Sequence, residues 1–268
     1  MAIITISRGS NSRGKEVAEL VAKQLGYDCI SRDVLLEASE RFNIPEIRLN
    51  RAIHDSPSIL ERLTYSKDEY ITYIKAALLK YLREDNIVYH GLAGHFFVKN
   101  IPHVLKVRII ADVQERIKIE MEREKISRDE AERVIKNDDE ERKKWSLSLY
   151  GIDTGNPTLY DLIIHIGKIG AKDAAGIICQ TAKLDCFKTT PESQKIIDDM
   201  ALVAQVKATL IKINPNIEVS VNKNNINITA RLRQPDADVI ARLEAVAKSV
   251  AGNRDVNVKM LPITVFTD

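Results

Sequence analysis

A seven-residue loop near the N-terminus constrains this chain more than any other feature. Residues 9–15 read GSNSRGK, a GxxxxGK spacing, and they follow a short β-branched run at 2–6 and precede a helical pattern. Glycines let such a loop curl so that several N–H groups point inward, and the lysine reaches the β- and γ-phosphates of a nucleotide. The sequence therefore predicts a phosphate-binding loop, or P-loop, between a first strand and a first helix. An ordinary strand-to-helix turn is the alternative.

The loop also supplies the first candidate site residues. The predicted ATP-binding residues are Gly9, Ser10, Asn11, Ser12, Arg13, Gly14, Lys15 and Glu16. Lys15 is also a predicted catalytic residue, because its charge would stabilise the transferring phosphoryl group. Glu16 stands where such loops carry Ser or Thr, whose hydroxyl ligates Mg²⁺. A carboxylate also ligates Mg²⁺ but repels neighbouring phosphates, so we expect Glu16 to form a weak Mg²⁺ site, or the ion to be held from elsewhere.

Strand-like runs alternate with helical patterns up to residue 187. The predicted strands are 2–6, 27–30, 86–89, 104–110 and 162–166. Helical segments fill roughly 33–84, with Pro45 and Pro57 as breaks. This alternation predicts an α/β fold of the P-loop NTPase type, in which helices cover both faces of a parallel sheet.

One helical segment is unusually rich in charge. Residues 112–144 hold 22 charged side chains among 33, ten basic and twelve acidic. Ser127 and Glu130 form the pattern of a capping box at a helix start. A solvated helical hairpin is the plain interpretation of such a run, and a functional helical lid over about 113–145 is the alternative.

Three segments together resemble the cytidylate kinase-like family. They are ITISRGSNSRGKEVAELVAKQLGYDCISRDVLLE at 4–37, the arginines of VQERIKIEMERE at 113–124, and DEERKKWSLSLYGIDTGNPTLYD at 139–161. The resemblance covers about residues 1–185. It implies a P-loop nucleoside monophosphate kinase domain over 1–187, with a parallel sheet, a monophosphate-binding insertion and a mobile lid at 113–145.

The resemblance also implies roles for residues outside the loop. Arg116, Arg123 and Arg142 match lid-side arginines that surround the transferring phosphoryl group and are predicted catalytic residues. Asp33, His90 and Asp139 are predicted to bind the acceptor. The family's third strand commonly ends in a Gly-Arg pair that supplies an acceptor arginine, whereas 90–95 reads HGLAGH. His90 replaces that arginine in part only when it is protonated.

The composition changes near residue 188. Residues 188–268 follow an α-β-β-α-β order, which predicts a small α+β domain. The alternating stretch NKNNINITARL at 222–232 resembles the bacterial osmotic-stress and nodulation (BON) domain without its glycines. This resemblance implies an accessory domain for binding or interaction, and a possible contact for homo-oligomer formation.

Charge and composition exclude several classes of partner. Lys and Arg number 40 against 38 Asp and Glu, giving a net charge of +2, and aromatic residues make up 5%. This balance does not favour a nucleic acid polymer or an anionic membrane. No apolar run reaches the roughly 20 residues of a membrane span. Three cysteines without a CxxC pair, and an N-terminus unlike a secretory signal, predict a cytoplasmic chain.

The sequence therefore predicts ATP-dependent phosphorylation of a nucleoside monophosphate, with CMP or dCMP as acceptor, ATP as co-substrate and Mg²⁺ as cofactor. A kinase for another small molecule on the same fold is one alternative. A nucleotide-binding regulatory protein with little turnover is the other, because Glu16 and the absent acceptor arginine depart from the family pattern.

Overall fold

The computed structural model describes residues 2–31, 33–43, 67–91, 94–232 and 236–262. Pro45 and Pro57, predicted helix breaks, lie outside these residues. The N-terminal elements are β1 (Ile3–Arg8), α1 (Gly14–Leu25), β2 (Asp28–Ile30), α2 (Asp33–Phe42), α5 (Lys67–Leu82), β3 (Ile87–His90), α6 (Gly94–Phe97), β4 (Val104–Ala111), α7 (Val113–Glu124), α8 (Arg128–Tyr150), η1 (Pro157–Leu159), β5 (Leu162–Ile166), α9 (Ala171–Thr181) and η2 (Asp185–Phe187). The C-terminal elements are α10 (Pro191–Leu210), β6 (Ile217–Asn222), β7 (Asn225–Leu232), α11 (Ala237–Ala251) and β8 (Asp255–Pro262).

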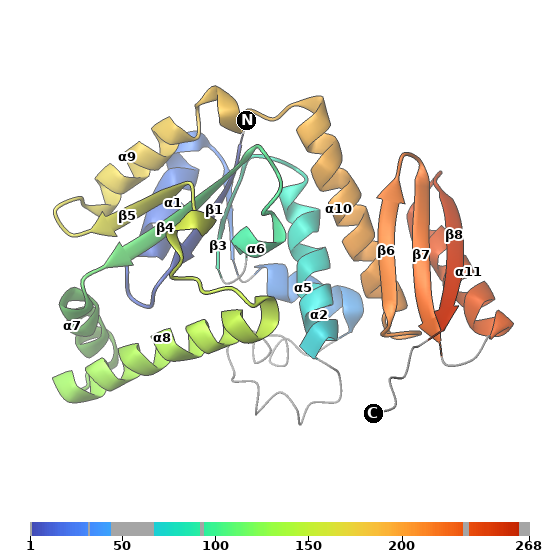
Figure 1. Cartoon of the computed structure of the whole chain (residues 1–268). Coiled ribbons are helices and arrows are strands. Elements are labelled where there is room, and N and C mark those ends of the chain that lie inside the picture. Colours follow the sequence, from blue (N-terminus) through green and yellow to red (C-terminus); the bar gives the residue numbers. More distant parts are fainter. Residues whose placement is uncertain (1, 32, 44–66, 92–93, 233–235, 263–268) are drawn as a thin grey trace.

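The first five strands form one parallel sheet in the order β2-β3-β1-β4-β5. β1 is central, with β3 and β4 on either side, so the loop that follows β1 emerges in the middle of the sheet edge (Figure 1). Ligands of open α/β sheets bind at the carboxyl ends of the strands. The predicted α/β fold with helices on both faces is confirmed, and all five predicted strands are present within two residues of their expected ends.

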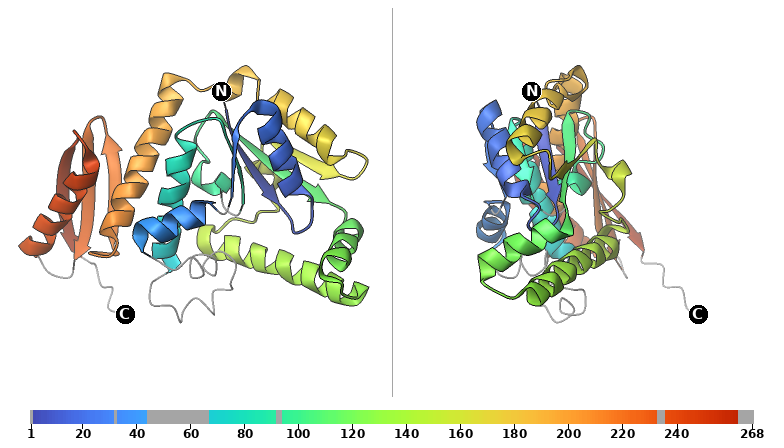
Figure 2. Two further views of the ribbon diagram at one scale, coloured as in Figure 1. Left: turned by 180° about the vertical axis from the view of Figure 1, so that it is seen from behind. Right: turned by 90° about the vertical axis from the view of Figure 1, so that its left-hand side faces the viewer.

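Two apolar layers hold the sheet between helices. On one face, α1 and α9 pack over Ile4, Ile6, Val107 and Ile109. On the other face, α2, α5 and α10 pack over residues that include Ile3, Tyr89 and Val104. Figure 2 shows the sheet between these two groups of helices. Side chains along each strand alternate between the layers, because consecutive residues of a strand point to opposite faces.

The charge-rich segment forms a helical hairpin of α7 and α8 beside the sheet edge (Figure 1). Ile117, Ala131 and Ile135 form a small core of their own between the two helices. The predicted capping box is confirmed, because the Ser127 side chain accepts from the Glu130 backbone and the Glu130 carboxylate accepts from Ser127 N at 3.0 Å. The hairpin is therefore held together locally; most of its charged side chains are exposed, whereas Glu120 is buried.

The C-terminal part has the predicted α-β-β-α-β order in α10, β6, β7, α11 and β8. β6 pairs antiparallel with β7, and β7 pairs parallel with β8. Residues of α10, the inward face of this sheet and α11 form its core, which contains Leu210, Ile226, Ile228 and Leu243. Gly252, at φ 62°, ends α11 as the sequence indicates.

Helix α10 belongs to two cores at once. Ile197, Ala204 and Ile211 pack into the core under the parallel sheet, beside α5. Val206 and Leu210 of the same helix pack into the C-terminal core. Figure 1 shows α10 between α5 and the small sheet. The expected boundary at residue 187 therefore falls before a helix that both parts use.

Among the described residues, no helix combines the length and apolar character that crossing a membrane requires.

Candidate functional site

The predicted phosphate-binding loop lies between the end of β1 and the start of α1. Asn11 and Arg13 have φ values of 55° and 60°, a backbone conformation that residues other than glycine rarely adopt. Within the loop, the Ser12 hydroxyl donates to the Gly9 carbonyl oxygen at 3.0 Å. Loops that alternate between right- and left-handed backbone turn successive N–H groups into an anion-binding concavity. The positive φ values of Asn11 and Arg13 agree with such a backbone.

Gly14 allows a close approach that a side chain would prevent, whereas a side chain at Gly9 would make only ordinary contact with its neighbour. A Cβ at Gly14 would lie 2.6 Å from Cβ and 2.8 Å from Cδ of Arg8. A Cβ at Gly9 would lie 3.4 Å from Cζ of Arg116. The loop thus lies against two arginines, one from β1 and one from the lid.

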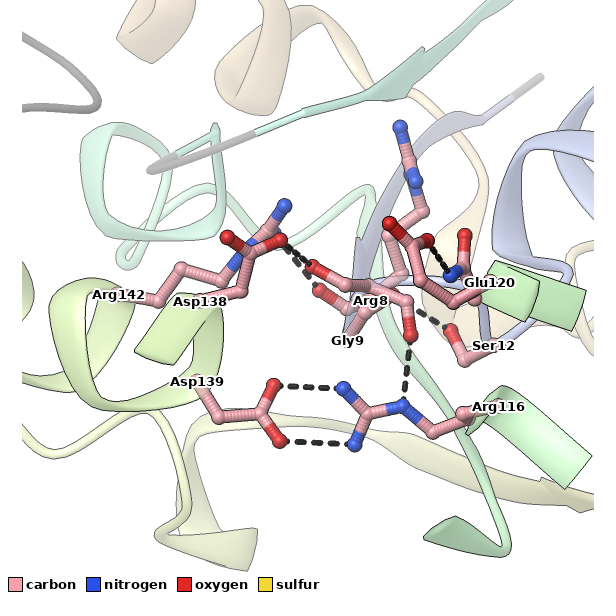
Figure 3. A network of polar contacts seen from close by, with 10 residues as sticks. Arg8, Gly9, Ser12, Arg116, Glu120, Asp138, Asp139 and Arg142 are labelled. Atoms are coloured by element: carbon pink, nitrogen blue, oxygen red, sulfur yellow. Dashed lines mark hydrogen bonds and ion pairs between the residues drawn. The ribbon is translucent and has the colours of Figure 1, made fainter. Parts of the chain in front are cut away.

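Arg116 of α7 ties the lid hairpin to this loop. Its Nε donates to the Ser10 carbonyl oxygen at 2.6 Å, and its two terminal nitrogens donate to the Asp139 carboxylate at 2.8 and 2.7 Å (Figure 3). The Arg116 side chain is 11% exposed. A bidentate arginine–carboxylate pair fixes both groups in plane and direction. Two predicted site residues, Arg116 and Asp139, therefore form one unit at the mouth of the loop.

Further contacts close the lid over the loop. The Ser10 hydroxyl donates to Asp138 at 2.7 Å, and Asn11 Nδ2 donates to the Glu120 carboxylate. Arg123 donates to Asn11 Oδ1 at 3.1 Å and pairs with Glu120, which is 2% exposed. Both lid helices thus contact the phosphate-binding loop. These contacts fix the hairpin against the loop.

A pocket of about 290 Å³ lies where the strand ends, the loop and the lid meet. It is lined by Ser7, Arg8, Gly9, Ser12, Arg108, Ile110, Ala111, Arg116, Asp139, Arg142, Lys143, Asp153, Thr154 and Gly155. Five basic side chains line it, from β1, β4, α7 and α8. This concentration of positive charge suits a polyanion such as a nucleotide phosphate chain.

The charges in the pocket are incompletely balanced. Arg116 pairs with Asp139, and Lys143 pairs with Asp153 at 3.0 Å. Burial lowers the pKa of Arg142, and burial together with the nearby Arg142 charge lowers the pKa of Arg8. Both directions show that positive charge in this place is costly without an anion. The guanidinium groups nevertheless stay charged near neutral pH.

Arg142 reaches the pocket from α8, and its Nη1 donates to the Arg8 carbonyl oxygen at 3.2 Å (Figure 3). The pocket thus gathers the predicted residues Gly9, Ser12, Arg116, Asp139 and Arg142. Arg123 lies beside the loop through Asn11 and is not among the lining residues.

The other predicted residues lie around the pocket rather than in it. Lys15 is 66% exposed, and its Nζ lies 3.7 Å from Glu19. Asp33 accepts a hydrogen bond from Ser31 N at 3.2 Å at the start of α2. His90 is buried at the end of β3, and burial lowers its pKa to about 4. At neutral pH His90 is therefore uncharged and does not replace the absent acceptor arginine as a cation.

Glu16, the predicted Mg²⁺ ligand, pairs with Arg13. Its two carboxylate oxygens accept from Nε and Nη2 of Arg13, each at 2.8 Å. The described residues contain no group of three or more His, Cys, Asp or Glu placed to hold a metal ion. Mg²⁺ commonly takes one or two carboxylates together with substrate phosphates, which a single residue such as Glu16 fits once its pair with Arg13 opens.

Three basic residues that line the pocket were not predicted: Arg8, Arg108 and Lys143. Arg8 lies beyond the end of the predicted strand 2–6, Arg108 lies within the predicted strand 104–110, and Lys143 lies within the charge run. The signal for Arg108 is its place in the strand VLKVRIIA, whose other charged residue, Lys106, lies on the same face. A charged residue near the carboxyl end of a parallel strand points to the ligand edge of the sheet.

Comparisons with known proteins identify the family of the N-terminal part. The model of the cytidylate kinase-like family matches residues 3–168. The cytidylate kinase of Archaeoglobus fulgidus is 29% identical over 188 residues, which cover 69% of this chain and 97% of that protein. The cytidylate kinase of Thermococcus kodakarensis is 35% identical over 96 residues, covering 36% of this chain and 49% of that protein.

Among solved structures, an uncharacterized protein from Eubacterium ventriosum superposes with a TM-score of 0.52 at 19% identity. The match covers 68% of this chain and 98% of that one. It supports the fold of the N-terminal part.

Proposed function

Because this chain belongs to the cytidylate kinase-like family, we propose that it transfers the γ-phosphoryl group of ATP to CMP or dCMP. The chain is a nucleoside monophosphate kinase, and its choice of base is the finer part of the proposal. Cytidylate kinases are the relatives that support this choice, including one that matches over nearly its whole length. These relatives do not favour the alternative of a regulatory protein with little turnover.

The single observation that carries the proposal is the arginine-lined pocket between the phosphate-binding loop and the lid. Phosphoryl transfer needs little covalent chemistry from the protein, and it depends on positioning and on charge around the transferring group. Residues 9–15 would hold the β- and γ-phosphates of ATP through backbone N–H groups and Lys15. Arg116 and Arg142 would face the transferring group from the lid.

Lys15 must change its direction for this role. It points along α1 toward Glu19, and lysine is a flexible side chain that reorients at little cost. Mg²⁺ bound with ATP would supply charge neutralisation of the β- and γ-phosphates. The hairpin of α7 and α8 would exclude water from the transferring phosphoryl group, so that ATP is not hydrolysed in place of transfer to the acceptor.

The proposal is tested by a coupled kinase assay over all common nucleoside monophosphates with ATP and Mg²⁺. We expect kcat/KM for CMP or dCMP to exceed that for AMP, GMP and UMP. A higher kcat/KM for another monophosphate would overturn the cytidine assignment, and no turnover with any of them would overturn the kinase.

For the remaining part of the chain we propose two domains, 1–187 and 188–268, the second a BON-like accessory domain. The α10-β6-β7-α11-β8 order supports this assignment. We further propose that 188–268 mediates homo-oligomer formation, which light scattering on the full chain tests directly. A cytoplasmic location is proposed because Cys29, Cys179 and Cys186 are free thiols.

A further inference from the structure

Three arginines in the pocket form no ion pair with any carboxylate that the structure describes: Arg8, Arg108 and Arg142. All three are partly buried and line the same pocket of about 290 Å³. Carboxylates act on two of them without forming an ion pair: Asp138 and Asp139 on Arg142, and Asp153 on Arg108. A bound anion in this pocket would add the direct pairing that a partly buried cation lacks here. Arg8 and Arg142 lie beside the phosphate-binding loop, whereas Arg108 approaches from another strand.

Arg108 is held in a fixed direction. Its Nη1 donates to the Thr154 carbonyl oxygen at 2.5 Å and to the Tyr160 hydroxyl at 3.0 Å, and its Cζ lies 5.4 Å from the centre of the Tyr160 ring. The Tyr160 hydroxyl also contacts Ser7 Oγ at 3.3 Å and His95 Nε2 at 3.4 Å. An arginine has five N–H donors, and these contacts occupy one nitrogen. The others remain for a ligand.

The position of Arg108 places it close to the segment that follows β3, because the Tyr160 hydroxyl joins Arg108 to His95 of α6. Arg108 is paired in register with Ser7, next to the loop that follows β1. It lies on the same face as Val104, the face that α2 and α5 cover, whereas α1 covers the opposite face. A group at Arg108 therefore meets the loop from the side opposite to α1.

Arg108 also supplies a positive charge that the segment after β3 lacks. The segment after β3 carries no arginine, and the buried His90 at its end is neutral near pH 7. β3 and β4 flank β1 on either side, and neighbouring strands lie about 4.8 Å apart. His90 shares the face of Val88, which α1 covers, whereas Arg108 shares the opposite face with Val104. Arg108 therefore brings positive charge to the end of β1 from the face that α1 does not cover.

We propose that Arg108 binds the phosphate of the acceptor nucleoside monophosphate, in the role that the segment after β3 leaves unfilled. This proposal rests on the proposed kinase function. Tyr160 and Thr154 act as positioning residues that orient the guanidinium. The competing interpretation is structural: Arg108 would only anchor the segment that contains Thr154 to β4.

The test replaces Arg108→Met, which keeps an unbranched apolar stem and removes the charge. Lys106→Met is the matched control, because Lys106 lies two residues earlier on the same face of β4, pairs with Asp161 and does not line the pocket. Initial rates are measured with CMP varied at saturating Mg²⁺·ATP and with ATP varied at saturating CMP. Calorimetry measures binding of CMP and of cytidine to each variant.

We expect Arg108→Met to raise KM for CMP by about 10- to 100-fold, the range of a charge-assisted hydrogen bond, and KM for ATP by less than threefold. The affinity advantage of CMP over cytidine should shrink by the same factor. Arg108→Lys should restore part of the loss, and Lys106→Met should change neither KM.

An unchanged KM and affinity for CMP would overturn the proposal while the kinase function stands. A rise in KM for ATP alone would overturn it too, since Arg108 would then serve the donor. Equal losses for both substrates together with a lower melting temperature would show the structural role instead. If the wild-type chain phosphorylates no monophosphate, the proposed function fails and this inference fails with it.

Discussion

Replacing Gly14→Ala should destabilise the protein, although alanine is the better helix former. The new Cβ would lie 2.6 Å from Cβ and 2.8 Å from Cδ of Arg8. Packed carbons sit about 3.5–4.0 Å apart, so relief needs roughly 1 Å of movement. The Arg8 Cβ is fixed to the backbone of β1 and cannot rotate away, so either β1 or the loop must shift.

The size of the effect follows from two opposing contributions. Overpacking of this kind costs about 1–3 kcal/mol, and alanine in place of glycine within a helix returns about 0.5–1 kcal/mol. We expect Gly14→Ala to lower the free energy of unfolding by about 1–2 kcal/mol. Because a shift of about 1 Å at a reacting centre costs on the order of 100-fold in rate, kcat should fall more than stability suggests.

Gly176→Ala is the matched control. Gly176 lies within α9, and a Cβ there would meet nothing within 4 Å. It should therefore stabilise the protein by about 0.5–1 kcal/mol and leave kcat unchanged. Urea unfolding measures both variants, and the coupled kinase assay measures turnover. If Gly14→Ala proves as stable and active as Gly176→Ala, the close packing of the loop on Arg8 is not what requires this glycine.

Four further outcomes are expected. Lys15→Ala should lower kcat by about 10²- to 10³-fold with unchanged circular dichroism, as loss of one charge-stabilising group does; unchanged turnover would remove Lys15 from the site. Glu16→Thr should preserve or tighten Mg²⁺·ATP binding in calorimetry, whereas a large loss would make the carboxylate a needed ligand. Burial, with nearby positive charge, lowers the pKa of His95 to about 3, below its unfolded value of about 6.5. The free energy of unfolding should therefore fall as pH drops from about 6.5 toward 3; in urea titrations His95→Asn should flatten this dependence, and an unchanged pH dependence would contradict the buried, neutral His95. Amide exchange in 113–145 should be faster than in the sheet strands and should slow when ATP and acceptor bind together.

Local patterns in the sequence were enough to predict the elements of the sheet. β5 (Leu162–Ile166) has the predicted ends, and Gly26, at φ 69°, ends α1 as its position after the apolar pattern indicates. Such features depend on residues close together in the chain. The order of the strands and the covering of each face depend on contacts between distant segments, which a periodic pattern does not specify.

Part of the site was also predictable from local patterns, and part was not. The loop 9–15 has a spacing of its own, and the structure brings Arg116, Asp139 and Arg142 to it as the resemblance implies. Arg108 was not predicted, because nothing in the sequence joins it to Tyr160, 52 residues away. Its role emerges only from the register of β4 with β1.

The packing of α10 into two cores was not predicted. Apolar residues lie on two sides of this helix, beside exposed charged residues such as Lys195. Residues 197, 201, 204, 208 and 211 contact one core, and 206 and 210 contact the other. The expected boundary at 187 assigned the whole helix to the second domain, which uses only the second of these surfaces.

A helix shared in this way makes the two halves of the chain thermodynamically dependent on each other. Unfolding of the C-terminal sheet would expose one side of α10 and weaken its packing against α5. Because the two parts then unfold together, calorimetry should record one transition rather than two. Anything that binds the small sheet in its folded form would, by linkage, also raise the stability of α5 and of the face of the sheet that α5 covers. Binding at the C-terminal sheet would thus make α5 more rigid, although no ligand is bound at α5 itself.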